Sequence, residues 1–224
     1  MASTYVNNLR LNELATGDGA GTWGTTTNTN LELIGEALGF GTEAITTNAD
    51  THASTVADGS TDAARAMYIK YTGTLDSACT ITIGPNTLKR VQFIENATSG
   101  SQNIIISQGS GANITILPGD VKVVYLDGAG SGAAVVDAFA SLSVADLSVS
   151  GALGVTGVLT GTSLDISGNI DVDGVTNLDV VDIDGAVNMA TTLLVTGNVD
   201  FNGDLDVDGT TNLDVVDIDG AVDM

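Results

Sequence analysis

The chain has 224 residues, of which six are Lys or Arg and 28 are Asp or Glu, so its formal net charge is −22. This balance excludes a nucleic-acid-binding surface, which needs clustered positive charge, and it disfavours binding to anionic membranes. With 43% apolar residues, the composition indicates a folded chain rather than a disordered one. No apolar run approaches the ~18 residues of a membrane span, and we expect neither membrane insertion nor a secretory signal.

Residues 1–45 are polar and rich in Gly, Thr and Asn. Thr29 or Asn30 is a suitable N-cap for a helix over residues 31–38, with Gly39 at its end. Such a segment cannot form its own core, so we expect it to become ordered by packing against a partner, with Trp23 as the anchor. The alternative is that Trp23 packs on the chain's own β domain. The expected docking residues are Tyr5, Leu9, Leu11, Trp23, Leu31 and Ile34.

Residues 46–140 show about seven short strand patterns separated by turn clusters, which predicts a small antiparallel β-sandwich or barrel. The expected strands cover residues 67–71, 80–83, 91–94, 104–106, 114–117, 121–126 and 134–139. The chain has only one histidine and one cysteine, which disfavours a metal or catalytic cluster built from these residues. His52 is expected to be exposed, and Cys79 to be a small buried hydrophobe.

Residues 141–224, the repeat segment, follow a different rule. They carry 15 aspartates and no cation, whereas all six Lys and Arg residues lie within the first 122 positions. Residues 169–189 and 204–224 match at 17 of 21 positions, and a shorter unit of the form apolar-x-apolar-x-Gly recurs through the segment. Such self-similarity predicts a stacked or fibrous architecture.

Alternation such as Ile170-Asp171-Val172-Asp173 predicts short strands with an aliphatic face and a carboxylate face. The aliphatic face needs a partner, either the next coil of a single-chain solenoid or identical chains around an axis. The irregular spacing of the closing glycines, six or eleven to twelve residues apart, favours identical chains. The residues expected in the shared core are Leu164, Ile166, Ile170, Val172, Ile183, Val207 and Ile218.

No motif predicts a catalytic, cofactor or metal site. Asp204, Asp206, Asp208 and Gly209 are spaced like the start of an EF-hand loop, but its twelfth position is Val215 instead of Glu. The regularly spaced aspartates are better explained as a solvated strand face, with looser binding of Ca²⁺ or Mg²⁺ as an alternative.

The pattern of three blocks resembles the tail-fibre proteins of tailed bacteriophages, especially those infecting marine bacteria. These blocks are STYVNNLRLNELATGDGAGTWGTTTNTNLELIGEALGFGTEAI at the N-terminus, MYIKYTGTLDSACTITIGP through NIIISQGSGANITILPGDVKVVYLDGAGSG in the middle, and the NLDVVDIDGAV repeat. The resemblance implies a parallel homotrimer located in the virion tail. Its N-terminal region would dock to a tail protein, and a distal fibre or host receptor would lie beyond residue 224.

We therefore expect three parts: an attachment segment (1–45), a β domain (46–140) and a trimeric β shaft (141–224). The expected function is structural, in host adsorption, and not enzymatic. The alternative is a carbohydrate-binding or single-chain β-helix protein. Against glycan binding, the aromatic residues of 46–140 fall mostly on apolar strand positions; they are Tyr68, Tyr71, Phe93, Tyr125 and Phe139.

Overall fold

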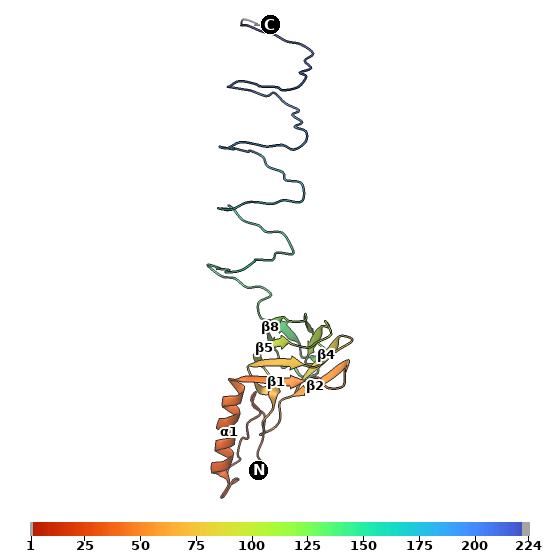
Figure 1. Cartoon of the computed structure of the whole chain (residues 1–224). Helices are drawn as coiled ribbons and strands as arrows, with labels where there is room; N and C mark the ends of the chain where they lie inside the picture. The colour runs from red at the N-terminus through yellow and green to blue at the C-terminus, as the bar shows by residue number, and fades with distance from the viewer. Residues whose placement is uncertain (1, 221–224) are drawn as a thin grey trace. The chain divides into compact units, whose positions relative to one another are not determined.

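The computed structural model describes residues 2–220 and divides the chain into two compact units, Met1–Leu153 and Gly154–Met224 (Figure 1). All helices and strands of the described residues lie in the first unit. In chain order they are α1 (Trp23–Ala37), β1 (Phe40–Ala44), β2 (Thr51–Thr55), η1 (Ala63–Arg65), β3 (Tyr68–Thr72), β4 (Cys79–Gly84), β5 (Arg90–Asn96), β6 (Ile104–Ser107), β7 (Ile114–Ile116), β8 (Val121–Leu126), η2 (Gly130–Gly132) and β9 (Val135–Asp137).

Helix α1 begins about two turns before the predicted start. The backbone N–H groups of Thr22 and Trp23 both donate to the carbonyl of Gly19, and this turn opens the helix. Asn30, one of the expected caps, lies inside α1 and bonds the backbone of Asn12 instead. The predicted helix start was therefore wrong: the side chain of Asn30 makes a tertiary contact with Asn12 and does not cap the helix.

The β strands form two mixed sheets, with the orders β1-β3-β5-β8-β9 and β2-β4-β6-β7. The predicted antiparallel sandwich is therefore wrong in its strand direction. From β1 to β6 the chain adds one strand to each sheet in turn, so each strand pairs in parallel with the next but one. Only the pairs β5–β8, β6–β7 and β8–β9 are antiparallel. All seven predicted strands are present, and β1 and β2 are additional.

Successive turns of the chain stack closely at one corner between the sheets. The N–H of Ser99 donates to the carbonyl of Gly73, and the N–H of Leu75 donates to the carbonyl of Ser99. Gly73 and Gly100 both have positive φ, and a Cβ on either would overlap a backbone carbonyl oxygen, that of Ile45 or of Leu75 respectively. Both positions therefore need glycine for conformation and for space.

The inner faces of the two sheets enclose one aliphatic core. Its central residues have at most 2% of their surface exposed; they include Ile69, Ile81, Ile83, Ile94, Ile104, Ile106, Ile116, Val124 and Leu126. Cys79 is fully buried in this core, which confirms the prediction for the cysteine. Burial raises the pKa of its thiol.

Most of the aromatic side chains of residues 46–140 are not buried, although they lie on apolar strand positions. Only Tyr71 of the five is buried, whereas Phe93, Tyr125 and Phe139 have 38%, 42% and 53% of their surface exposed. Phe93 and Tyr125 occupy outward positions of β5 and β8, because the alternation along each strand gives the inner positions to Gln92, Ile94, Val124 and Leu126.

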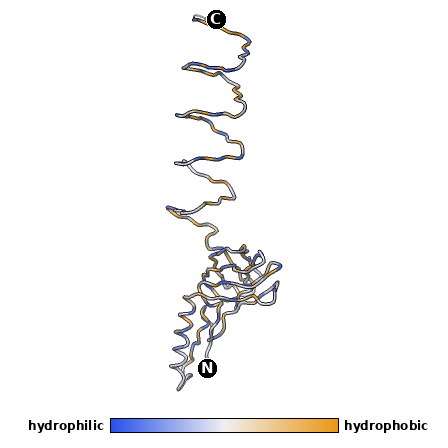
Figure 2. The backbone as a smooth tube through the Cα atoms, in the orientation of Figure 1, coloured by the Kyte–Doolittle hydropathy of each residue, from blue (hydrophilic) through white to orange (hydrophobic). Residues whose placement is uncertain are grey.

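The second unit contains no helix or strand in its described part, residues 154–220. Its backbone winds through a series of similar coils (Figure 1), along which hydrophilic and hydrophobic stretches alternate (Figure 2). Every residue of this stretch is exposed, and no backbone–backbone hydrogen bond forms within residues 143–220. The expected strands do not form in a single chain, because a strand needs a neighbour to pair with.

The stacked corner makes a direct prediction for stability. We expect Gly100→Ala to lower the free energy of unfolding by about 3 kcal/mol, through positive φ and overlap with the Leu75 carbonyl. Gly119→Ala is the matched control, because Gly119 also has positive φ but open space around it; we expect a loss of about 1 kcal/mol. Urea unfolding of both variants measures the difference, and equal losses would contradict the role of the close contact.

Candidate docking surface

The N-terminal arm, residues 2–21, folds back on itself and lies against the rest of the first unit. The amide oxygen of Asn7 accepts hydrogen bonds from the N–H groups of Leu9 and Leu11, at 3.2 and 2.9 Å, and closes a turn. Asn12 and Asn30 exchange two hydrogen bonds of 3.0 and 2.9 Å between the arm and α1. The arm and the helix are therefore positioned together.

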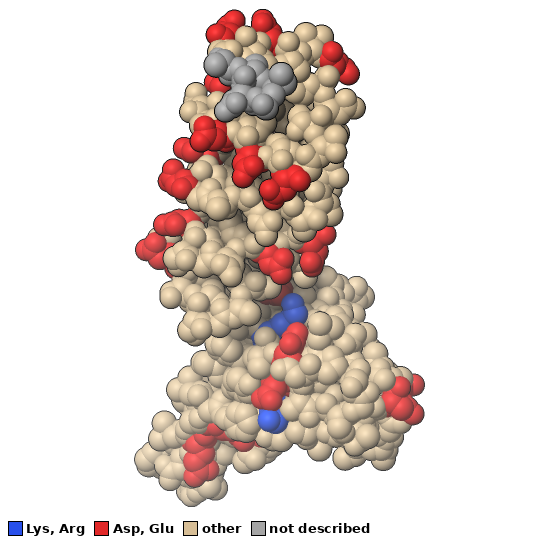
Figure 3. Space-filling view, turned by 45° about the horizontal axis from the view of Figure 1, so that its top comes forward, with Lys and Arg blue, Asp and Glu red and all other residues tan. Residues whose placement is uncertain are grey.

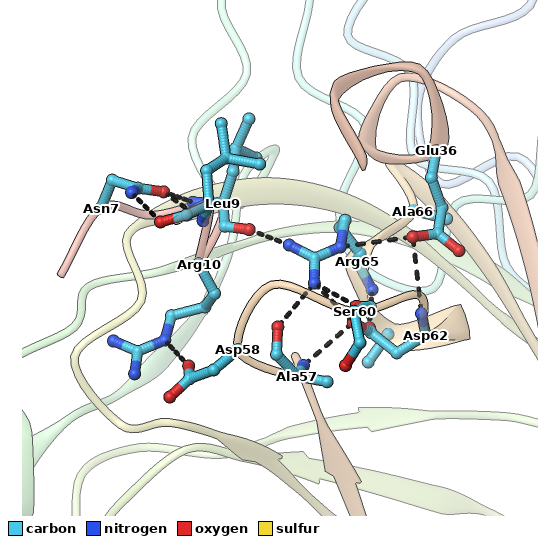
Figure 4. Close-up of polar contacts among 12 residues, drawn as sticks. Asn7, Leu9, Arg10, Glu36, Ala57, Asp58, Ser60, Asp62, Arg65 and Ala66 are labelled. Atoms are coloured by element: carbon cyan, nitrogen blue, oxygen red, sulfur yellow. Dashed lines mark hydrogen bonds and ion pairs between the residues drawn. The ribbon is translucent and has the colours of Figure 1, made fainter. Parts of the chain in front are cut away.

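Arg65 joins the arm, the helix and the loop after β2 in one buried contact (Figure 4). Its guanidinium is fully buried and donates to the carbonyl oxygens of Leu9, Ala57 and Ser60, the last two at 2.6 and 2.8 Å. Its Nη2 also donates to a carboxylate oxygen of Asp62 at 2.9 Å. Its Nε lies 3.3 Å from a carboxylate oxygen of Glu36, near the end of α1.

Asp62 positions the residues around Arg65 by accepting hydrogen bonds from their backbone N–H groups. Its carboxylate caps η1 by accepting from the N–H of Arg65 at 2.7 Å, and it accepts from the N–H of Ala57 at 2.9 Å. From the other side, Gln92 and Arg90 of β5 donate to carbonyl oxygens between Ala64 and Ala66. A planar guanidinium with five donors fits this set of acceptors, whereas an ammonium group does not.

The six predicted docking residues separate into two groups. Trp23, Leu31 and Ile34 lie on α1 with 66%, 61% and 37% of their surface exposed. Tyr5, Leu9 and Leu11 are partly covered within the arm. Trp23 does not pack on the chain's own strands to any large extent, which disfavours the alternative considered for it.

Helix α1 has an apolar face that extends beyond the predicted residues. Leu31, Ile34 and Leu38 recur at helical spacing, and Leu38 and the following Phe40 are 68% and 62% exposed. On the opposite face, Leu33 and Ala37 are buried against the first unit. One side of the helix therefore anchors it, and the other side presents aliphatic side chains to the outside.

A shallow hollow of about 170 Å³ continues this apolar face onto the sheet. Seven residues from the arm, α1, β5 and the residue before β3 line it: Leu9, Ile34, Ala37, Leu38, Met67, Arg90 and Val91. Leu38, Met67 and Val91 were not predicted. Burial lowers the pKa of Arg90 to about 10, which leaves it cationic at neutral pH. We define the docking surface as Trp23, Leu31, Ile34, Leu38 and this hollow.

His52 is not exposed as predicted but belongs to a polar network between β1, β2 and β3. Its Nε2 lies 2.7 Å from a carboxylate oxygen of Glu43. The other oxygen of Glu43 accepts from Ser54 at 2.6 Å, and Tyr71 donates to the Ser54 hydroxyl at 2.9 Å. Ser54 is fully buried and bonds the carboxylate rather than the imidazole. The arrangement therefore provides no accessible nucleophile with an adjacent base.

Within residues 2–220, no group of three or more His, Cys, Asp or Glu side chains is placed to hold a metal ion. The same part of the chain has no helix long and apolar enough to cross a bilayer. Asp and Glu side chains are scattered over the visible surface rather than gathered in one cluster (Figure 3).

Comparison of the chain with protein-family models, with curated proteins and with solved structures gives no match.

The buried contact of Arg65 can be tested by one conservative change. We expect Arg65→Lys to lower the free energy of unfolding by about 3 kcal/mol, because an ammonium group leaves buried acceptors unpaired. Arg10→Lys is the control, since the Arg10–Asp58 pair of 2.6 Å lies at the surface, where Asp58 is half exposed; its expected cost is below about 1 kcal/mol. Urea unfolding gives both values, and a cost for Arg65→Lys no larger than the control's would refute this role.

Proposed function

We propose that the chain is a structural protein of a virus particle, a tail fibre of a tailed bacteriophage. In this proposal the docking surface attaches the fibre to a tail protein, the β strands form a rigid body, and residues 141–224 form the shaft of a parallel homotrimer. The fibre projects toward a distal fibre or a host receptor during adsorption. The support for the family is the resemblance of the three sequence blocks.

The observation that carries the proposal is the state of the repeat segment in a single chain. Its aliphatic side chains are about half exposed or more: Leu164, Ile166, Ile170, Val172, Ile183, Val207 and Ile218 range from 45% to 71%. Leaving so many aliphatic side chains in water costs free energy that burial between chains would recover. The unpaired backbone of residues 143–220 would gain partners in the same step.

Pairing with identical chains fits this segment because aliphatic residues alternate with aspartates along the repeat. Three copies in register bring aliphatic faces to a common axis and leave the aspartates in water. A single-chain solenoid would bury the same residues only by stacking coils of the same chain. No contact of that kind pairs the backbone in residues 143–220.

The trimer predicts a mass and a sensitivity to substitution. Sedimentation equilibrium of the full chain should give about three times 22.5 kDa. Replacing Ile170 and Val172 together by Ser should lower the melting temperature, because both residues would leave the shared core. Asp171→Ser, between them on the carboxylate face, should leave the melting temperature unchanged or raise it by reducing repulsion. A stable folded monomer would end the proposal of a trimer.

The docking surface predicts a loss of attachment without a loss of folding. Trp23→Ala and Leu31→Ser remove exposed apolar side chains, so we expect trimers that unfold like the original but no longer join the tail. Asn28→Ala, at another exposed position of α1, is the control and should attach normally. The assay adds purified chain to tail particles assembled without it and follows cosedimentation. Normal attachment of both variants would place the anchor elsewhere.

A further inference from the structure

Part of the outer face of the five-stranded sheet is apolar, whereas its other outward positions hold Thr42, Ala44, Lys70, Thr72 and Glu95. One row of register partners runs Phe40–Tyr68–Phe93–Val123, and a second runs Val91–Tyr125–Val136. The rings within the first row pack on one another, with centroids 5.4 Å apart for Phe40 and Tyr68 and 6.2 Å for Tyr68 and Phe93. Val91 also lines the docking hollow. We call the other six residues of these two rows, with Val121 on β8, the aromatic face.

This face is unlike the outer face of the other sheet. Its outward positions are small or polar on β2, β4 and β7, and Ile105 on β6 is its large apolar exception. On the aromatic face, Phe40, Val121 and Tyr125 are 42% to 62% exposed. A sheet face in water ordinarily carries polar side chains, so the aromatic face has the composition of a covered surface.

The charged groups beside the aromatic face, in the next row of register partners, are paired with each other. Lys70 Nζ lies 2.9 Å from a carboxylate oxygen of Glu95, and the Tyr68 hydroxyl donates to the other oxygen at 2.8 Å. The hydrogen bonds from Lys70 and then from Tyr68 hold the pKa of Glu95 below its usual value, so the pair stays ionised at neutral pH. The face therefore carries no net charge, although the whole chain carries −22.

We propose that the aromatic face is the surface through which the first unit packs against two further copies of this chain. This inference rests on the proposed trimer, which would bring three first units to the same end of the assembly. The first unit has 14 acidic and six basic residues, a net charge of −8, so its copies repel each other. The neutral aromatic face is where they can approach without that cost. Apolar burial between copies then offsets the loss of freedom on association.

A carbohydrate ligand fits the aromatic face less well. Sugar hydroxyls need free polar groups beside the stacking rings, whereas here the lysine, the carboxylate and one tyrosine hydroxyl are engaged with each other. The neighbouring positions Val91, Val121, Val123 and Val136 offer no hydrogen bonds. Both the rings and their surroundings are instead typical of the apolar core of a protein interface.

Single-cysteine variants of the full chain test the contact. The natural Cys79 is fully buried, so the unmodified chain serves as the blank. Val121→Cys and Tyr125→Cys place a thiol on the aromatic face outside the docking hollow, and Thr82→Cys places one at an exposed outward position of the other sheet. Each variant is treated with a short bismaleimide at low protein concentration, its sedimentation is measured, and covalent dimers are counted on a denaturing gel.

We expect all three variants to sediment as trimers, with covalent dimers from Val121→Cys, Tyr125→Cys or both, and none from Thr82→Cys. Trimers without dimers from either aromatic-face variant overturn this inference and leave the trimer standing, as does an equal yield from Thr82→Cys. Binding of a glycan probe to the trimer that Val121→Cys abolishes would assign the face to carbohydrate and also overturn it. A monomer in sedimentation would instead refute the proposed trimer itself.

Discussion

From β1 to β6 the chain adds one strand to each sheet in turn, and this alternation constrains most of the first unit. Each strand lies parallel to the one added a turn earlier, so its inward residues meet inward residues of the previous turn. The core is consequently a stack of aliphatic layers, from Ile69 and Ile81 to Ile94 and Ile106. The same stacking brings corner backbones so close that Gly73 and Gly100 have no room for a side chain.

The first layer of the stack has a different composition from those that follow. Glu43 on β1 and His52 and Ser54 on β2 occupy inward positions, and they bond each other and the hydroxyl of Tyr71. Burial raises the pKa of Tyr71, so its hydroxyl remains a donor in this network. The network satisfies polar groups at the first strands of both sheets, where aliphatic side chains would have no further layer to cover them.

Arg65 holds the N-terminal arm and α1 in place through buried polar contacts with Leu9 and Glu36. A buried guanidinium costs a large desolvation energy, and it is retained here with acceptors from three segments of the chain around it. The helix is thereby fixed at its last turn through Glu36, with its apolar side turned outward. In the proposed attachment, a helix held in this way would have less freedom to lose on binding. Within the described part of the repeat segment no buried polar contact of this kind fixes the chain. Its aliphatic side chains would be covered by identical chains in the proposed trimer.

The sequence by itself predicted the local elements where side-chain pattern and backbone preference agree. The seven apolar strands between β3 and β9, the buried Cys79 and the repeat with its segregated charge all follow from alternation and composition. Trp23, Leu31 and Ile34, three of the residues expected to dock, are exposed on α1; their docking role stays a prediction.

Only the tertiary structure decided what depends on contacts between distant residues. Strand direction follows from which strand is the neighbour, and the alternation between sheets has no signature in the strand patterns themselves. β1 and β2 escaped prediction because their inward residues are Gly41, Glu43, His52 and Ser54, which become inward only through partners on other strands. The sequence does not distinguish Arg65 from the other cations, because the carbonyls of Leu9, Ala57 and Ser60 come together around it only in the fold. The outward place of Phe93 and Tyr125 was likewise set by the register, since a single strand does not reveal which of two apolar faces meets the core.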